Sequence, residues 1–159
     1  MEGLFWYNPE LFPQQFVDEI KRMKSQIGIC SLSRVKNNLL MWSHYANGSR
    51  GIAIGVELDH HKHTPKPVIY GDLPNFKESP DVVSTDTALN ILSHKHSAWE
   101  YEKEERVFTL NYETYVNCSI QEIVMGSKID PTDEELLKKL IEKVNPTITI
   151  TRIEDDDLE

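Results

Sequence analysis

Between residues 29 and 58 the hydrophobic pattern predicts a strand, a helix and a second strand with very short connections. Apolar side chains recur at helical spacing over residues 37–47, and Gly48 follows where a left-handed residue ends many helices. Residues 52–58 then alternate between large apolar and small or polar side chains, which is typical of a strand. Because apolar or aromatic side chains surround most of the predicted helix, we expect it to be covered on several sides.

Elsewhere the chain alternates between helical and strand patterns. An apolar stripe with charged residues opposite predicts a helix from Pro13 to about Ile27, and acidic residues around Pro131 predict the start of a helix that runs to about Val144. A capped apolar segment predicts another helix over about residues 84–96. Further strands are predicted over residues 29–32, 66–70, 102–110, 120–125 and 147–153.

This order of elements predicts an α+β fold, with a mixed, mostly antiparallel, split sheet of about five to six strands and three to four helices packed on it. A chain of 159 residues is long enough for one domain with a hydrophobic core. We therefore expect a single domain over residues 1–153, followed by an acidic, disordered tail over residues 154–159.

The formal charge of −9 and the isoelectric point near 5.1 argue against a general electrostatic attraction to nucleic acid or to anionic membranes. No stretch approaches the roughly 18 consecutive apolar residues of a membrane span. The first ten residues lack the charged and apolar regions of a signal peptide. We therefore expect a cytoplasmic protein that contacts no membrane.

The histidines offer metal ligands, but their spacing matches no known zinc motif. His60, His61 and His63 form one cluster, and His94 and His96 form a second. We interpret both clusters as solvated loops and expect no metal site.

The sequence around residues 99–110 places charged residues directly before an apolar strand. Along an extended chain Glu102, Glu104 and Arg106 share one face, which continues into apolar side chains. Two carboxylates and a guanidinium at a strand start are candidates for binding or catalysis. The alternative is structural, with Arg106 paired to Glu104 at the end of a sheet and the other acids in water.

The predicted helix over residues 37–47 also carries polar groups that need partners. Ser43, His44 and Tyr45 follow one another on it, and a covered helix must satisfy their polar atoms inside the fold or at a cleft that holds a ligand. Arg50 follows shortly after the helix.

Three motifs together resemble an uncharacterised bacterial and phage family, a domain of unknown function (DUF2971). They are Ser31-Leu32-Ser33 at the end of a strand, LLMWSHYA at residues 39–46 followed by Arg50-Gly51, and W-x-Y-E-x-E-x-R at residues 99–106. The resemblance extends over about residues 27–152. That family is itself distantly similar to ADP-ribosyltransferases, whose split sheet binds NAD and whose catalytic glutamate often stands in an E-x-E pair.

This resemblance implies NAD as the substrate, with Glu104 as the catalytic acid and Glu102 as its companion. A carboxylate stabilises the positive charge that develops when a glycosidic bond breaks. Serine supports the sheet, an aromatic ring stacks on nicotinamide, and an arginine fork holds the pyrophosphate. The substrate-binding residues that it implies are Ser31, Ser33, Trp42, His44, Tyr45, Arg50 and Arg106.

Members of that family carry an additional strand and an N-D-P segment before the Ser31-Leu32-Ser33 strand. This chain has about thirty residues there and contains no such segment. The resemblance therefore leaves three alternatives: a fragment of a longer protein, a shortened relative completed by a second copy or an N-terminal partner segment, or a form that binds without turnover.

Three functional hypotheses follow. The first is an NAD-using transferase or glycohydrolase, such as a toxin or phage-defence effector, that takes a small nucleotide and a protein or RNA acceptor. The second is a nuclease or other hydrolase in which His44 acts as the base. The third is a nucleotide- or protein-binding module without turnover. The first requires that the glutamates and the aromatic helix line one cleft.

Overall fold

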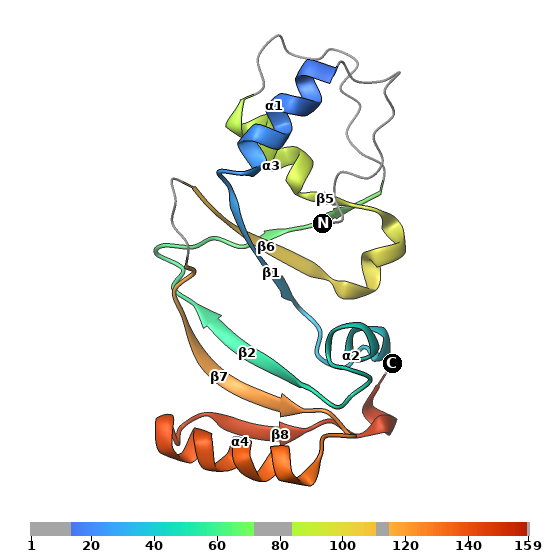
Figure 1. Ribbon diagram of the computed structural model, residues 1–159, viewed down its shortest axis with the longest axis vertical. Helices are drawn as coiled ribbons and strands as arrows, with labels where there is room; N and C mark the ends of the chain where they lie inside the picture. Colours follow the sequence, from blue (N-terminus) through green and yellow to red (C-terminus); the bar gives the residue numbers. More distant parts are fainter. Residues whose placement is uncertain (1–13, 72–83, 111–114, 159) are drawn as a thin grey trace. The chain divides into compact units, whose positions relative to one another are not determined.

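The computed structural model describes residues 14–71, 84–110 and 115–158 (Figure 1). These residues fall into two compact units. The first unit comprises residues 1–34 and 63–116, and the second comprises residues 35–62 and 117–159. Each unit is built around its own three-stranded sheet.

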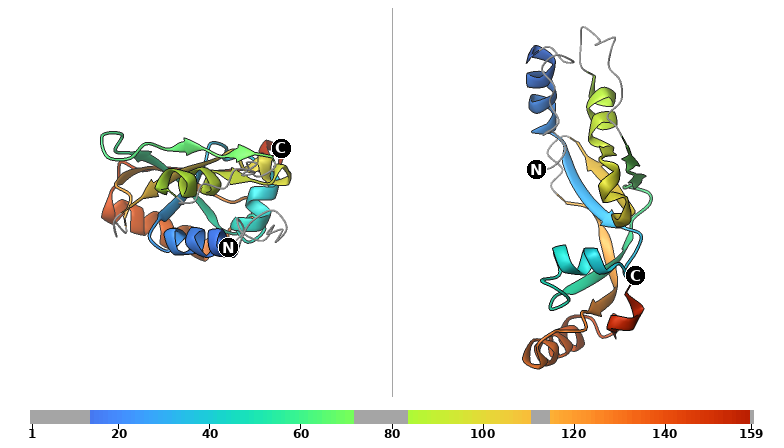
Figure 2. Two further views of the ribbon diagram at one scale, coloured as in Figure 1. Left: turned by 90° about the horizontal axis from the view of Figure 1, so that it is seen from above. Right: turned by 90° about the vertical axis from the view of Figure 1, so that its right-hand side faces the viewer.

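The sheet of the first unit has the order β1-β6-β3, with β6 (Glu104–Thr109) in the centre between β1 (Gly28–Ser33) and β3 (Lys66–Pro67). Both pairings are antiparallel, and Figure 2 shows β1 and β6 side by side. Ser31 lies opposite Arg106 in the register. Directly opposed residues of an antiparallel pair point to the same face, so Ser31 and Ser33 of β1 share one face with Glu104 and Arg106 of β6.

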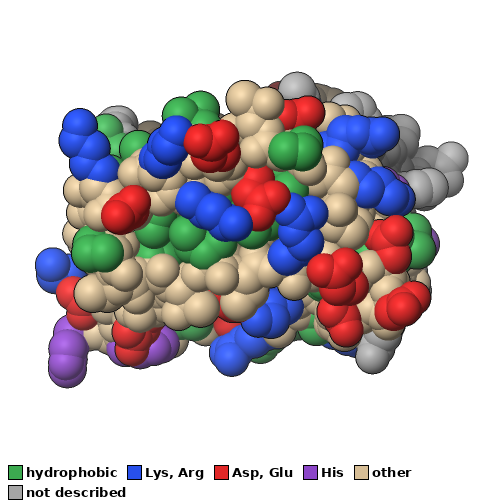
Figure 3. All heavy atoms as spheres, turned by 90° about the horizontal axis from the view of Figure 1, so that it is seen from below, with side chains coloured by type: hydrophobic (Ala, Val, Ile, Leu, Met, Phe, Trp, Pro, Cys, Tyr) green, Lys and Arg blue, Asp and Glu red, His purple; other side chains and the backbone are tan. Residues whose placement is uncertain are grey.

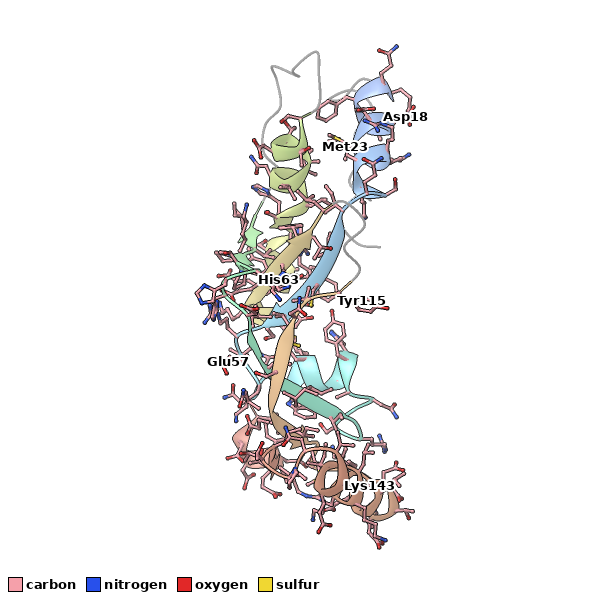
Figure 4. The ribbon with its side chains drawn as sticks, turned by 90° about the vertical axis from the view of Figure 1, so that its left-hand side faces the viewer. Asp18, Met23, Glu57, His63, Tyr115 and Lys143 are labelled. Atoms are coloured by element: carbon pink, nitrogen blue, oxygen red, sulfur yellow. The ribbon has the colours of Figure 1, made fainter. Side chains whose placement is uncertain are left out.

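Two helices pack together in the first unit: α1 (Gln14–Lys24) and α3 (Thr85–Leu92). The N-cap of α3 is Ser84, whose side chain accepts a hydrogen bond from the backbone nitrogen of Thr87. Met23 of α1, labelled in Figure 4, packs against the core between the two helices. The buried residues of this core are Phe16, Ile20, Ala88 and Ile91.

A short parallel pair and a 3₁₀ helix lie between β3 and β6 in the chain. The pair consists of β4 (Ile69–Tyr70) and β5 (His94–Lys95), and the 3₁₀ helix η1 spans Ser97–Glu102. Lys103 then adopts a left-handed conformation, with φ of 44°, and turns the chain into β6. This path places the side chains of β5 and of the end of η1 near the start of β6.

The sheet of the second unit has the order β2-β7-β8. Strand β2 (Ile52–Leu58) is antiparallel to β7 (Cys118–Met125), which is parallel to β8 (Thr149–Arg152). Helix α4 (Pro131–Val144) connects β7 to β8. Its apolar face packs on the sheet in a core cluster built around Ile123, Ile141 and Ile148.

Gly55 marks an irregularity in the β2–β7 pair. The register shifts between Gly55 and Val56, and a Cβ atom at Gly55 would lie 3.2 Å from Cβ of Glu122. The glycine therefore allows the close approach of the neighbouring strand at a β-bulge.

Helix α2 (Leu39–Tyr45) is shorter than the predicted 37–47 segment. Only one face of it is buried, by Trp42 and by Ala46 just after the helix, which pack with Val124 and Ile153. The prediction that the helix is covered on several sides is wrong. Of its other large apolar residues, Met41 is half-buried, whereas Leu39, Leu40 and Tyr45 are 49%, 47% and 60% exposed.

Three successive residues after α2, Asn47, Gly48 and Ser49, have left-handed backbone conformations. The prediction of a left-handed Gly48 is therefore confirmed, although its neighbours share the conformation. The loop packs tightly on Gly126, where a Cβ atom would lie 2.1 Å from the carbonyl oxygen of Ser49. Only glycine fits at position 126 without movement of this loop.

The described part of the acidic tail, up to Leu158, contains a short helix. Residues Asp155–Asp157 form a 3₁₀ helix, η2, with a capping box between Glu154 and Asp157. Leu158 packs against the apolar cluster that contains Trp42. This apolar contact at the end of the tail gives the preceding acidic residues a fixed path.

The α+β class and the mixed, mostly antiparallel pairing are confirmed. The described strands form two separate three-stranded sheets, one in each unit, and the short pair β4 and β5. The single domain over residues 1–153 stays a prediction. Among the described residues, no helix has both the length and the apolar composition needed to cross a membrane.

Candidate functional site

Four charged side chains gather beside the start of β6 in the first unit: Lys95, Glu102, Glu104 and Arg106. They come from β5, from the end of η1 and from β6 itself. Their side chains are only 10%, 5%, 6% and 14% exposed, respectively. We call this group the buried charge cluster. Its two acids and two bases balance, which is the condition for burying charges without a large penalty.

Glu104 is the centre of the buried charge cluster. Arg106 donates from Nε to Oε1 at 2.7 Å and from Nη2 to Oε2 at 3.1 Å, which is a bidentate pair. Lys95 donates from Nζ to Oε2 at 3.1 Å. Both carboxylate oxygens therefore accept charge-assisted hydrogen bonds, which fix the orientation of this side chain.

Lys95 joins the two glutamates. Its Nζ also donates to the carboxylate of Glu102 and lies 5.0 Å from the ring centroid of Trp99, within the range of a cation–π contact. The backbone carbonyl of Glu102 accepts a hydrogen bond from Oγ of Ser33 at 2.7 Å. Ser33 thus holds the end of η1 against β1.

Two hydroxyl groups complete the surroundings of Glu104. The Ser31 side chain hydrogen-bonds to its carboxylate, and the Tyr70 hydroxyl accepts a hydrogen bond from its backbone nitrogen at 2.7 Å. Ser31 is exposed although Glu104 is buried. The carboxylate therefore comes nearest to solvent on the side of Ser31.

The surroundings set the protonation states of these groups. Burial alone would raise the pKa of Glu104, but hydrogen bonds from Arg106 and Ser31 outweigh it and hold that pKa below its ordinary value. Burial alone would lower the pKa of Lys95, but hydrogen bonds to the two glutamates raise it. Burial raises the pKa of Tyr70. At neutral pH Glu104 is ionised and Lys95 is protonated.

The remaining residues implied by the resemblance lie in the second unit. Trp42 is buried and donates from Nε1 to the carbonyl oxygen of Lys36 at 2.7 Å. His44 and Tyr45 are exposed on α2, with their rings 6.2 Å apart, edge to face. Arg50 is exposed, with a long 3.5 Å contact from Nη1 to a backbone carbonyl. A common cleft for these residues and the glutamates stays a prediction.

The sequence predicted Glu102, Glu104, Arg106 and the two serines as neighbours of one site, and these lie together. Sequence reasoning missed Lys95 and Tyr70. Lys95 lies between two histidines in a segment that we interpreted as a solvated loop. A signal was present nonetheless, because two buried carboxylates with a single arginine leave a negative charge that requires a second cation.

The histidines also differ from the expected solvated loops in one respect, because His63 is only 3% exposed. His94 lies with Nδ1 2.7 Å from the carbonyl oxygen of Asn90. Over the described ranges of the chain, no three His, Cys, Asp or Glu side chains are arranged to hold a metal ion.

Residues 41–107 match the model of a family described as "Protein of unknown function (DUF2971)". The match covers less than half of the chain, reaches into both units and includes the whole buried charge cluster. It supports the resemblance to that family over those residues. Comparison with curated proteins gave no match, and neither did comparison with solved structures.

Proposed function

We propose that the protein is an NAD-using enzyme with ADP-ribosyltransferase-like chemistry, in which Glu104 stabilises the charge that develops on the substrate. The hydrogen bond between Ser31 and the Glu104 carboxylate carries this proposal. It joins the exposed strand β1 to the second acid of an E-x-E pair at the start of β6, which is the arrangement that the resemblance implies. The lowered pKa of Glu104 keeps the carboxylate ionised at neutral pH.

The proposed reaction breaks the bond between C1′ of the ribose and the ring nitrogen of nicotinamide. The electron pair of this bond leaves with nicotinamide, and C1′ becomes positively charged in the transition state. A fixed carboxylate lowers the energy of that charge and accepts hydrogen bonds from ribose hydroxyls. An acceptor group or water then forms a bond to C1′ and releases its proton to solvent.

The donors and acceptors of the first unit fit part of this substrate. Arg106 and Lys95 use both lone pairs of Glu104 Oε2 and one of Oε1, and Ser31 also hydrogen-bonds to this carboxylate. In our proposal a ribose hydroxyl displaces the Ser31 hydroxyl from the carboxylate. Arg106 is less suited to pyrophosphate, because its nitrogens donate to Glu104 and to the carbonyl oxygen of Leu92.

The aromatic residues that the resemblance implies for stacking belong to the second unit. Trp42 is buried and its indole nitrogen already donates to a backbone carbonyl. Tyr45 is 60% exposed, so its ring is the better candidate to stack on nicotinamide.

One observation favours a second candidate function, a nucleotide-binding module without turnover. The Glu104 carboxylate accepts from Arg106 through two nitrogens and from Lys95 through a third, which is also the geometry of a purely structural ion-pair network. In that case the ligand binds and stays intact. No observation on the described residues favours the hydrolase that would use His44.

The test is release of nicotinamide from NAD, measured by chromatography with and without mixtures of candidate protein and RNA acceptors. We expect release by the wild type and about a hundredfold or greater loss in Glu104→Gln, because the amide carries no negative charge. Ser31→Ala, which changes an exposed residue, is expected to lower the rate less. Glu100→Gln is the matched control, since this glutamate is 60% exposed in η1.

Equal background release from the wild type and Glu104→Gln contradicts the enzymatic proposal. Thermal unfolding of each variant shows whether a loss of activity reflects a loss of fold. Ligand-observed NMR with NAD distinguishes the enzyme from the binding module. Binding of NAD without release of nicotinamide supports a module without turnover, whereas neither binding nor release excludes NAD as the ligand.

A further inference from the structure

Helix α4 carries an apolar stripe on the side that faces away from its own sheet. Ile141 is buried, and Leu137 packs with it against the sheet. Leu136, Leu140 and Val144 are instead 66%, 53% and 69% exposed. Figure 3 views the molecule from the side on which α4 lies and shows hydrophobic side chains at the surface among basic and acidic ones.

Four exposed residues of α4 form a regular seam: Asp133, Leu136, Leu140 and Lys143. Successive members are separated by three, four and three positions, which is the spacing of the contact positions of a coiled coil. The seam reads acid, leucine, leucine, base. A second copy that runs in the opposite direction reads base, leucine, leucine, acid, so the seam is complementary to itself.

We propose that this seam binds the seam of a second copy of the chain, as an antiparallel helix pair with two-fold symmetry. The two-fold axis passes between Leu136 and Leu140, so each leucine meets the other leucine of the second copy. Asp133 meets Lys143 of the second copy at both ends. Such an interface is isologous and closed, so association stops at the dimer.

The charges at the two ends of the seam favour a second copy over an apolar peptide. Within the described part of the chain, Asp133 and Lys143 take part in no ion pair. Their neighbours differ: Glu134, for example, pairs with Lys138 at 2.6 Å on the same helix. Lys143, labelled in Figure 4, extends from the end of α4. An uncharged partner would leave both charges without a counter-charge.

The expected dimer is weak. One helix face contributes much less than the about 800 Å² per partner of a standard protein interface. We therefore expect a dissociation constant in the micromolar range or weaker. Association is then visible only when the protein concentration is varied.

The test uses sedimentation equilibrium of the full chain at increasing protein concentration. The wild type is expected to rise from 18.4 kDa towards twice that mass. Leu140→Glu is expected to remain at the monomer mass, because it places two carboxylates in the apolar part of the seam. Glu142→Lys is the control, since this exposed residue of α4 lies off the seam.

A charge exchange tests the direction of the pairing. Asp133→Lys alone places two lysines opposite each other at both ends and is expected to weaken the dimer about tenfold or more. Lys143→Asp alone has the same effect with the opposite sign of charge. The double variant Asp133→Lys/Lys143→Asp restores both pairs and is expected to associate like the wild type.

A wild type that stays at 18.4 kDa at every concentration overturns the proposal. So does a dimer that Leu140→Glu leaves unchanged, or a folded double variant that fails to recover association. Circular dichroism at low concentration identifies variants that do not fold. If a charge variant does not fold, the association of Leu136→Gln and Leu140→Gln is measured in its place. Association that persists in both of these variants overturns the proposal.

Discussion

Lys95 is the cation that the two buried glutamates share, and its removal tests how the buried charge cluster is stabilised. Its side chain is 10% exposed, pairs with Glu102, and lies 3.1 Å from Oε2 of Glu104. Lys95→Met keeps most of the apolar stem but leaves two carboxylates facing one guanidinium. Removing one partner of a buried ion pair costs about 3–5 kcal/mol. We expect a loss of this size in the free energy of unfolding at neutral pH.

The assay is urea unfolding at pH 7, followed by far-ultraviolet circular dichroism and by tryptophan fluorescence, since Trp99 lies beside Lys95. The double variant Lys95→Met/Glu102→Gln is expected to recover part of the loss, because it removes the uncompensated charge. Lys103→Met is the matched control. That lysine is 53% exposed and 3.6 Å from its partner, so its removal is expected to cost less than about 1 kcal/mol.

Two results would refute this reasoning. One is a loss for Lys95→Met of less than about 1 kcal/mol, similar to that for Lys103→Met, which would mean that the cluster behaves like a surface ion pair. The other is a double variant that is less stable than Lys95→Met alone, which would mean that Glu102 does not depend on the lysine.

Two further predictions concern stability. The fold holds the pKa of Glu104 below its ordinary value of 4.5. The stabilisation from its ionised carboxylate is therefore fully present above pH 4.5 and is lost as the pH falls through the lower pKa of the folded state. In an acid titration, Glu104→Gln is expected to lose stability less steeply below pH 4.5 than the wild type. Gly126→Ala is expected to lower the free energy of unfolding by about 2 kcal/mol or more, because the new methyl group meets the Ser49 carbonyl oxygen; a thermal midpoint equal to that of the wild type would contradict this.

The sequence predicted most elements because their signals are local. Alternation marks β2, and the proline and acids at the start of α4 fix where that helix begins. The pairing of Ser31 with Arg106 was not predicted, because it joins residues 75 positions apart and depends on the register of β1 with β6. The sequence does place Glu104 and Arg106 on one face of their strand.

Two features could not be derived from the pattern for physical reasons. The exposure of Leu39, Leu40 and Tyr45 depends on how much of α2 the sheet covers. Apolar residues around the whole circumference of a helix do not indicate which of its faces is buried. Lys95 joins the cluster through the parallel pairing of β4 with β5, two strands of two residues each, which are too short to show a period. A charged residue in such a strand resembles a loop residue in the sequence.

We propose that the ionised Glu104 carboxylate beside Ser31 promotes cleavage of NAD. Time-resolved proton NMR of the wild type, Glu100→Gln and Glu104→Gln with NAD tests it directly, because free nicotinamide and NAD give separate signals in one sample. We expect nicotinamide signals to grow for the wild type and Glu100→Gln, and to stay at the level of the protein-free sample for Glu104→Gln. Identical growth in all three samples, with Glu104→Gln correctly folded, would contradict it.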